Sequence, residues 1–269
     1  MTKAPRFPLA LDQLRGAGSC TAQASDVLRP QRPLQDAATE AARRQTPSGL
    51  GLDSAAVRVR MVHRLRAGGV RDEAVLRAFS QVERHRFVDT ALANQAYEDT
   101  SLPIGLGQTI SKPSVVAHML SLLMAGITAR TLGGLGRVLE IGTGCGYQAA
   151  LLALLARGVV SIERLKALHD KAREHLALQL PSDLRLVYGD GRLGHAPRAP
   201  YDSIISAAGG EDLPQAWLDQ LAVGGRLVAP LHDAQRGGQV LLVVDREPQG
   251  LVRQWHDAVH FVPLKSGAA

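Results

Sequence analysis

Cysteine is scarce in this chain of 269 residues, because only Cys20 and Cys145 occur. Cys20 lies near the beginning of the chain and Cys145 lies inside a glycine-rich turn, so we expect no disulfide between them. The sequence therefore does not have the pattern of a small disulfide-stabilised secreted protein. Its cysteine usage fits a reducing compartment, and we expect a cytoplasmic protein.

Aromatic residues and long apolar runs are also rare. Phe, Trp and Tyr make up 4% of the chain, which gives little support for the stacking surfaces that bind single-stranded nucleic acids. The best apolar run, Ala149 to Ala156, is too short to cross a membrane and is followed by Arg157. The histidines show no spacing typical of a metal site. We therefore predict no membrane, nucleic-acid or metal partner.

The first 50 residues differ from the rest in composition. They are basic and proline-rich, they contain only one aromatic residue, Phe7, and they show no clear period. We expect residues 1–50 to be a disordered N-terminal extension. Such a basic segment could touch nucleic acid or an acidic surface, but a solvated leader is the simpler interpretation. Residues 51–135 are expected to form N-terminal helices and a substrate loop, and residues 136–269 a cofactor-binding core with C-terminal strands.

The most informative segment is an apolar run that ends in a glycine-rich turn, Val138-Leu139-Glu140-Ile141-Gly142-Thr143-Gly144-Cys145-Gly146-Tyr147. Glycine at every second position of the turn lets a cofactor approach bare backbone. The helix expected to follow offers free N–H groups at its N-terminus. A dinucleotide fingerprint would need a third glycine at position 147, which is tyrosine. The pattern is instead the acidic-x-G-x-G-x-G form that is usual in S-adenosylmethionine methyltransferases.

Three acidic residues follow three successive strand candidates. Glu140 could reach the methionine part of such a cofactor, Glu163 the ribose hydroxyls, and Asp190 the adenine amino group. Any one of them could be a solvated loop end, but their ordered placement at one sheet edge favours a ligand site. The predicted cofactor-binding residues are Glu140, Gly142, Thr143, Gly144, Gly146, Glu163, Asp190 and Gly191.

Strands and helices alternate from Arg137 onward, which predicts a mostly parallel α/β sheet. The expected strands are 137–142, 158–163, 184–189, 202–207 and 225–230, and the expected helices are 147–156, 165–179 and 213–221. Two further strand candidates, Gln239 to Val244 and Ala258 to Pro263, have no helix between them and predict an antiparallel edge.

Helical spacing also predicts helices before the sheet. They are expected at Asp53 to Arg66, Asp72 to about Val82 and Pro113 to Ala125, with mixed character over Arg84 to Ala96. Pro103, Gly105 and Gly107 indicate an irregular loop before the third helix.

Ser111 stands at the end of this loop, directly before a predicted helix. Its simplest role there is a helix cap. The functional alternative uses the same position, because a serine hydroxyl at a helix N-terminus can donate to a substrate carboxylate.

The segment around Ser111 and the glycine turn give the chain a specific resemblance. Over roughly residues 55–265 it resembles the protein-L-isoaspartate O-methyltransferases, which methylate isoaspartyl residues in damaged proteins. The carrying segments are Arg86-Phe87-Val88, Ala96 to Asp99, Leu102 to Gly105, Gly107 to Ser111 with Pro113, Val138 to Gln148, Ser161 to Arg164, Gly189 to Gly191, Leu221 to Val228 and Phe261 to Leu264. The Gln-Thr-Ile-Ser-x-Pro part is far more specific to this family than the glycine turn.

The resemblance implies a Rossmann-like methyltransferase core with added elements at both ends. It implies that Ser111 is the active-site serine that contacts the isoaspartyl carboxylate, and that Thr109 and Ile110 line the cofactor-side wall of that pocket. Glu163 and Asp190 would hold the ribose and adenine of S-adenosylmethionine. Leu106, often His in bacterial relatives, and the segment 207–211 depart from the family pattern and bear on peptide preference and turnover.

The implied reaction is transfer of a methyl group to the free carboxylate of an L-isoaspartyl residue, which starts repair of the damaged protein. The carboxylate is already ionised at neutral pH, so the sequence needs no general base. Two alternatives remain open at this point: a methyltransferase for a small molecule or RNA, and a catalytically silent relative that binds peptide. We expect damaged proteins and peptides as partners, and a monomer.

Overall fold

A seven-stranded sheet organises the part of the chain that the computed structural model describes, which is residues 55–177, 183–234 and 237–269. The chain divides into two units, Met1–Ser48 and Gly49–Ala269, and the structure described below belongs to the second unit. The predicted extension over residues 1–50, the start of the first predicted helix and the end of the helix at 165–179 lie outside the described residues.

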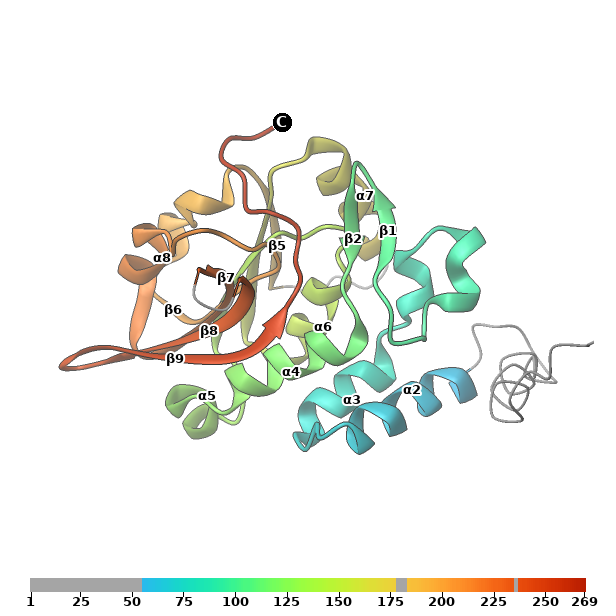
Figure 1. The fold of residues 1–269 in the computed structure, drawn as a ribbon, viewed down its shortest axis with the longest axis horizontal. Helices are drawn as coiled ribbons and strands as arrows, with labels where there is room; N and C mark the ends of the chain where they lie inside the picture. Colours follow the sequence, from blue (N-terminus) through green and yellow to red (C-terminus); the bar gives the residue numbers. More distant parts are fainter. Residues whose placement is uncertain (1–54, 178–182, 235–236) are drawn as a thin grey trace, which may run out of the picture. The chain divides into compact units, whose positions relative to one another are not determined.

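The strands run in the order β5-β4-β3-β6-β7-β8-β9 across the sheet (Figure 1). Their bounds are β3 (Arg137–Ile141), β4 (Gly158–Glu163), β5 (Leu184–Tyr188), β6 (Tyr201–Ser206), β7 (Leu221–Asp233), β8 (Gly238–Glu247) and β9 (Gly250–Val259). The first five pair in parallel, whereas β8 is antiparallel to both β7 and β9. The predicted α/β fold with a mostly parallel sheet, an antiparallel edge and N-terminal helices is confirmed.

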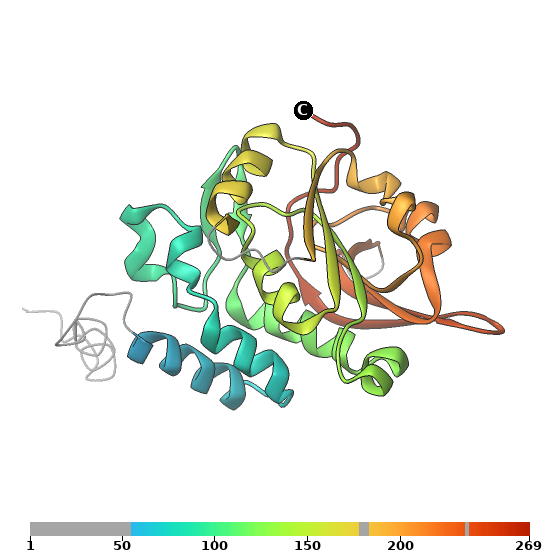
Figure 2. The ribbon, with the colours of Figure 1, turned by 180° about the vertical axis from the view of Figure 1, so that it is seen from behind.

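Helices cover both faces of the sheet (Figures 1 and 2). They are α2 (Ala55–Ala67), α3 (Glu73–Gln81), α4 (Pro113–Met124), α5 (Ile127–Leu132), α6 (Tyr147–Leu155), α7 (Lys166–Leu176) and α8 (Gln215–Gln220). Alternate strand residues divide between two buried clusters, because neighbouring side chains point to opposite faces. Val138 packs in the cluster that includes residues of α2, α3, α4, α6 and α7, and Leu139 packs in the cluster that includes Trp217 of α8.

The order in which successive strands are added to the sheet changes direction at β3. The chain passes from β3 to β4 and β5 on one side, and then returns to place β6 on the other side of β3. The crevice beyond the carboxyl end of β3 is therefore a topological switch point, where open α/β sheets bind ligands.

A two-stranded hairpin stands where the sequence predicted an irregular loop. Its strands are β1 (Leu102–Gly105) and β2 (Gln108–Ile110), and the register pairs Leu102 with Ile110. Leu106 and Gly107 both have positive φ, as the tight turns of hairpins require. The loop prediction was wrong because Pro103 and the glycines hid the alternation of buried and exposed residues along β1.

The structure also differs from the sequence analysis at three other places. The strand expected at Ala258 to Pro263 lies earlier, as β9, and residues 260–263 contribute only an isolated bridge between Gly209 and Pro263. β9 is an exposed edge strand without a buried face, so it shows no apolar alternation. The mixed segment before the hairpin forms two 3₁₀ helices, η2 (Arg84–Phe87) and η3 (Thr90–Gln95), and the short helix α5 was not predicted.

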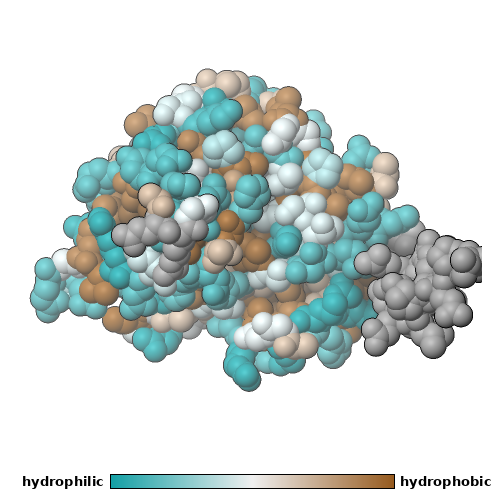
Figure 3. All heavy atoms as spheres, viewed as in Figure 1, coloured by the Kyte–Doolittle hydropathy of each residue, from teal (hydrophilic) through white to brown (hydrophobic). Residues whose placement is uncertain are grey.

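In the view of Figure 3, the surface is neither uniformly hydrophilic nor uniformly hydrophobic, because hydrophilic residues are interspersed with smaller hydrophobic areas. Among the residues that the structure describes, no helix combines the length and the apolar character needed to cross a membrane.

Candidate active site

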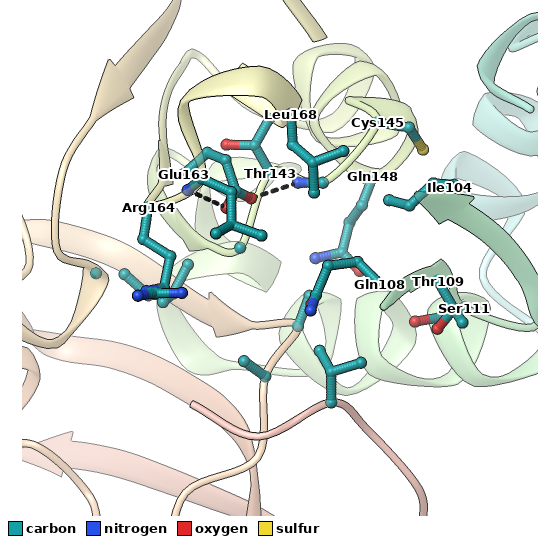
Figure 4. Close-up of a pocket in the computed structure, with 18 of the residues that line it drawn as sticks. Ile104, Gln108, Thr109, Ser111, Thr143, Cys145, Gln148, Glu163, Arg164 and Leu168 are labelled. Carbon is teal, nitrogen blue, oxygen red and sulfur yellow. Dashed lines mark hydrogen bonds between the residues drawn. The ribbon is translucent and has the colours of Figure 1, made fainter. Parts of the chain in front are cut away.

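A cavity of about 240 Å³ lies at the switch point. Its floor comes from the residues that follow β3, β4 and β6, and its walls come from the β1–β2 hairpin and from residues 262–265. Eight of the predicted site residues line it: Thr109, Ile110, Ser111, Gly142, Thr143, Gly144, Glu163 and Gly191. In Figure 4, Thr143 and Glu163 lie on one side and Thr109 and Ser111 on the other.

The glycine turn gives this cavity its bare-backbone wall. Gly142 and Gly144 have φ values of 88° and 57°, which residues with a side chain rarely adopt. A Cβ on Gly144 would also lie 3.2 Å from Ile104 Cδ1, across the cavity. The backbone conformation therefore favours glycine at both positions, and at Gly144 the close approach of the hairpin adds to that preference.

Glu163 is fixed at the cavity by two backbone N–H groups. Its Oε2 accepts a hydrogen bond from Gly144 N at 2.8 Å, and its Oε1 accepts one from Leu165 N at 2.9 Å (dashed in Figure 4). The side chain is almost completely buried yet lines the cavity. Each carboxylate oxygen has a second lone pair, so Glu163 can still accept from ligand hydroxyls.

Glu140 lies beneath the turn and does not line the cavity. It is fully buried, and Ser161 Oγ donates to its Oε2. Ser161 Oγ in turn shares a 2.6 Å hydrogen bond with Thr143 Oγ1, which reaches the cavity wall. Burial raises the pKa of Glu140 to about 8, and the neighbouring Ser161 hydroxyl and Gln148 amide oppose that rise. Glu140 is therefore connected to the cavity through Thr143 rather than by direct exposure.

Asp190 and Gly146 are also outside the cavity lining. Asp190 caps the 3₁₀ helix η4 (Gly191–Leu193) by accepting from Arg192 N, and its second oxygen accepts from Gly267 N at 2.6 Å. Gly146 is the N-cap of α6, and a Cβ there would lie 2.9 Å from Leu176 Cδ1. In this structure, Asp190 holds the C-terminal segment, and Gly146 lets α7 pack closely.

Ser111 does not cap α4. The N-cap position is Lys112, which makes no side-chain capping hydrogen bond. Asp99 takes that part instead: its carboxylate accepts from Ser114 N at 2.9 Å and from Ser114 Oγ at 2.7 Å. Within the described part of the chain, the Ser111 hydroxyl makes no hydrogen bond to another residue, and Ser111 lines the cavity. The cap prediction was wrong, and the hydroxyl is free to meet a ligand.

Sequence reasoning missed three features of the cavity. Gln148 lines it, and its buried Nε2 has no hydrogen-bond partner among the described residues. Gln108 of β2 points into the same space (Figure 4). Residues 262–265 close one side, held by hydrogen bonds in both directions between Gly209 and the segment around Pro263. Gln108, Gln148 and residues 262–264 stand in segments that carry the family resemblance, but no site role was predicted for any of them from the sequence.

The chain is similar to known proteins over most of its length. A family model described as protein-L-isoaspartate(D-aspartate) O-methyltransferase matches residues 56–269. A protein-L-isoaspartate O-methyltransferase of Methylibium petroleiphilum is 67% identical over 265 residues, which cover 98% of this chain and 97% of that protein. Another, of Leptothrix cholodnii, is 66% identical, covering 90% of this chain and 84% of that protein.

Solved structures give the same picture of the fold. A protein-L-isoaspartate O-methyltransferase structure superposes with a TM-score of 0.67 at 25% identity, covering 78% of this chain and 66% of that one. A Plasmodium falciparum structure, titled as a putative protein-L-isoaspartate O-methyltransferase in complex with S-adenosyl-L-homocysteine, has a TM-score of 0.62 at 23% identity and covers 76% and 96%. With the family match over most of its length, this chain belongs to the protein-L-isoaspartate(D-aspartate) O-methyltransferase family.

Proposed function

We propose that this cavity is the active site for the reaction of the family. The cofactor would bind on the glycine-turn side and the substrate on the hairpin side. The chain is a methyltransferase that uses S-adenosylmethionine and acts on the free carboxylate of L-isoaspartyl residues in damaged proteins and peptides. When bound, S-adenosylmethionine supplies the methyl group that the carboxylate receives. The roles of single residues below are our proposal.

The glycine-turn wall fits this cofactor chemically. Glu163 offers free lone pairs to the two ribose hydroxyls, and its position is already fixed by Gly144 N and Leu165 N. Gly142 and Gly144 leave backbone exposed where a bulky ligand must approach closely. Glu140, with Oε1 lacking a hydrogen-bond partner among the described residues, supplies negative charge beneath a cationic ligand when ionised. Thr143 and Gly191 complete this wall.

The hairpin wall fits a carboxylate. Ser111 places an unpaired hydroxyl at the cavity. Thr109 and Ile110 of β2, which directly precede Ser111, line the same cavity. An isoaspartyl carboxylate has an ordinary pKa of about 4 and is ionised at neutral pH, so no base has to remove a proton. Ser111 then orients the nucleophilic oxygen, and catalysis rests on holding the two reactants in position, an effect worth at most about 7–11 kcal/mol.

The single observation that carries this proposal is the free Ser111 hydroxyl in the same cavity as the fixed Glu163 carboxylate. A hydrogen bond from Ser111 to a charged oxygen contributes about 1.5–3 kcal/mol, which is roughly a 10- to 150-fold effect. Neither a small-molecule or RNA acceptor nor a silent peptide-binding role is favoured by a comparable observation.

The test uses two short peptides that differ only in isoaspartate against normal aspartate at one position, with labelled S-adenosylmethionine. We expect base-labile label on the isoaspartyl peptide alone, and a loss of at least about 10-fold in Ser111→Ala with unchanged cofactor affinity. Ser121→Ala is the matched control, because its hydroxyl bonds the Ala117 carbonyl within α4 and lies outside the cavity. Label on both peptides, or lost cofactor binding in Ser111→Ala, would contradict the assigned role.

A monomeric state and a cytoplasmic location are predictions from the sequence alone. Sedimentation of the full chain and fractionation of cells that express it would test them. The role of Asp190 toward adenine is likewise a prediction, because both of its oxygens accept backbone N–H groups in this structure.

A further inference from the structure

Arg84 is a buried charge without a carboxylate partner. It belongs to η2, it has no exposed surface, and it makes no ion pair with any described residue. Burial lowers the pKa of Arg84, although a guanidinium stays charged in proteins. Arginine is rarely buried completely unless it is paired, so the burial of Arg84 calls for a specific role.

Backbone carbonyls take the place of the missing carboxylate. Arg84 Nε donates to Ala96 O at 2.7 Å, and Nη2 donates to Ser111 O at 2.8 Å and more weakly to Thr100 O at 3.4 Å. Ala96 and Thr100 precede the β1–β2 hairpin, whereas Ser111 follows it. One side chain therefore joins both ends of the segment that forms the substrate wall.

The same guanidinium also touches the cofactor wall. Its carbon lies 4.8 Å from the centroid of the Tyr147 ring, a cation–π distance. Tyr147 directly follows the glycine turn, lines the cavity and is held edge-on by Phe79 and Phe87 at centroid distances of 6.2 and 5.5 Å. Arg84 thus lies between the Ser111 backbone and the first residue of α6.

We propose that Arg84 is a positioning residue that sets the distance and angle between Ser111 and the glycine turn. This inference rests on the proposed role of Ser111. Arg84 touches neither reactant directly; it acts by holding the Ser111 carbonyl, and so the Ser111 backbone, against a wall fixed by Tyr147. Lysine keeps the charge at this position but loses the planar fork that reaches several carbonyls at once.

Steady-state methylation of the isoaspartyl peptide by the full chain tests the proposal. We expect kcat to fall about 10-fold in Arg84→Lys and up to about 100-fold in Arg84→Met, since a misplacement of 1 Å can cost that much. The affinity for S-adenosylmethionine, measured by calorimetry, should change by less than about 3-fold, because Glu163 is untouched.

Arg226→Lys is the matched control. Arg226 is also mostly buried, pairs with Asp245 through two 2.7 Å contacts, and lies opposite Ser203, toward the amino ends of the parallel strands. Its kcat should stay within about 2-fold of the wild type.

A double variant separates positioning from general stability. If Arg84 acts through Ser111, then Ser111→Ala with Arg84→Lys should be no more than about 2-fold slower than Ser111→Ala alone. Losses that multiply, or full activity in both Arg84 variants while Ser111→Ala is slow, would overturn this inference and leave the role of Ser111 standing. Wild-type activity in Ser111→Ala would instead refute the proposed role of Ser111, and this inference with it.

Discussion

Glu140 makes the stability of this protein depend on pH in an unusual direction. It is fully buried beneath the glycine turn, and its pKa is raised from 4.5 to about 8. The groups that face it are the Ser161 hydroxyl from β4 and the Gln148 amide from α6, with the Glu163 carboxylate nearby as a like charge. None of these supplies a positive charge. Without the cofactor, the native state therefore holds a proton on Glu140 at neutral pH.

The sign follows from linkage between proton binding and folding. Below pH 4.5 both states are protonated at this group, and Glu140 contributes its full stability. Between pH 4.5 and about 8 the unfolded chain releases the proton and the native chain keeps it, so the free energy of unfolding falls by about 1.4 kcal/mol per pH unit. The accumulated loss is about 3 kcal/mol at pH 7 and at most about 5 kcal/mol above pH 8.

Glu140→Gln removes this titration and keeps an oxygen that can accept from Ser161. We expect the variant and the wild type to be close in stability at pH 5, and the variant to gain about 1.4 kcal/mol per unit as pH rises toward 8. Urea unfolding of both chains without cofactor at pH 5, 6, 7 and 8 measures this difference. Because every other titratable group is shared, the difference isolates Glu140. Parallel stability curves over this range would refute the reasoning.

Two further predictions concern the cavity walls. Glu163→Gln can accept through only one oxygen, so either Gly144 N or Leu165 N loses its acceptor; we expect the Kd for S-adenosylmethionine, measured by calorimetry, to rise about 10-fold or more. An unchanged Kd would argue against the ribose role. Leu106 has a φ of 53° at the hairpin tip, so Leu106→Gly should stabilise the chain by up to about 1 kcal/mol in thermal unfolding. A less stable variant would show that the exposed Leu106 side chain contributes packing that outweighs its backbone strain.

The parallel part of the fold was accessible from sequence because its signals are local. The strands β3 and β4 are short apolar runs, and each ends at an acidic residue or a glycine turn, so their predicted bounds agree with the structure to within one residue. The cofactor class followed from the spacing of three glycines, and the family from the Gln-Thr-Ile-Ser-x-Pro segment. Both predictions are confirmed by the family match and by the relatives that cover nearly the whole chain.

The parts that sequence reasoning missed depend on contacts between distant residues. Asp99 caps α4 from 15 positions before Ser114, and this contact removes the reason to assign Ser111 as the cap. The same holds for Arg84, whose burial cannot be seen from the charged run Arg84-His85-Arg86 around it. Strand β9 was misplaced because both of its faces are exposed, so the hydrogen bonds to β8 determine its position and no apolar pattern marks it.

The polar atoms on the two walls of the cavity differ in their hydrogen bonds, and this difference bears on which group can receive the methyl. On the cofactor side, both oxygens of Glu163 are already held by backbone N–H groups, so the wall is rigid before any ligand arrives. Facing the same space, the Ser111 hydroxyl and the Gln148 Nε2 make no hydrogen bond to any described residue. Gln148 Nε2 is buried, and a buried donor without a partner costs about 1–3 kcal/mol, which a ligand oxygen would recover. The Ser111 hydroxyl is only half-buried, and it can donate to the same ligand. An ionised carboxylate offers acceptors only, so its oxygens can accept from both of these donors. The free donors on this side of the cavity therefore suit a carboxylate as the group that receives the methyl, in agreement with the family to which the chain belongs.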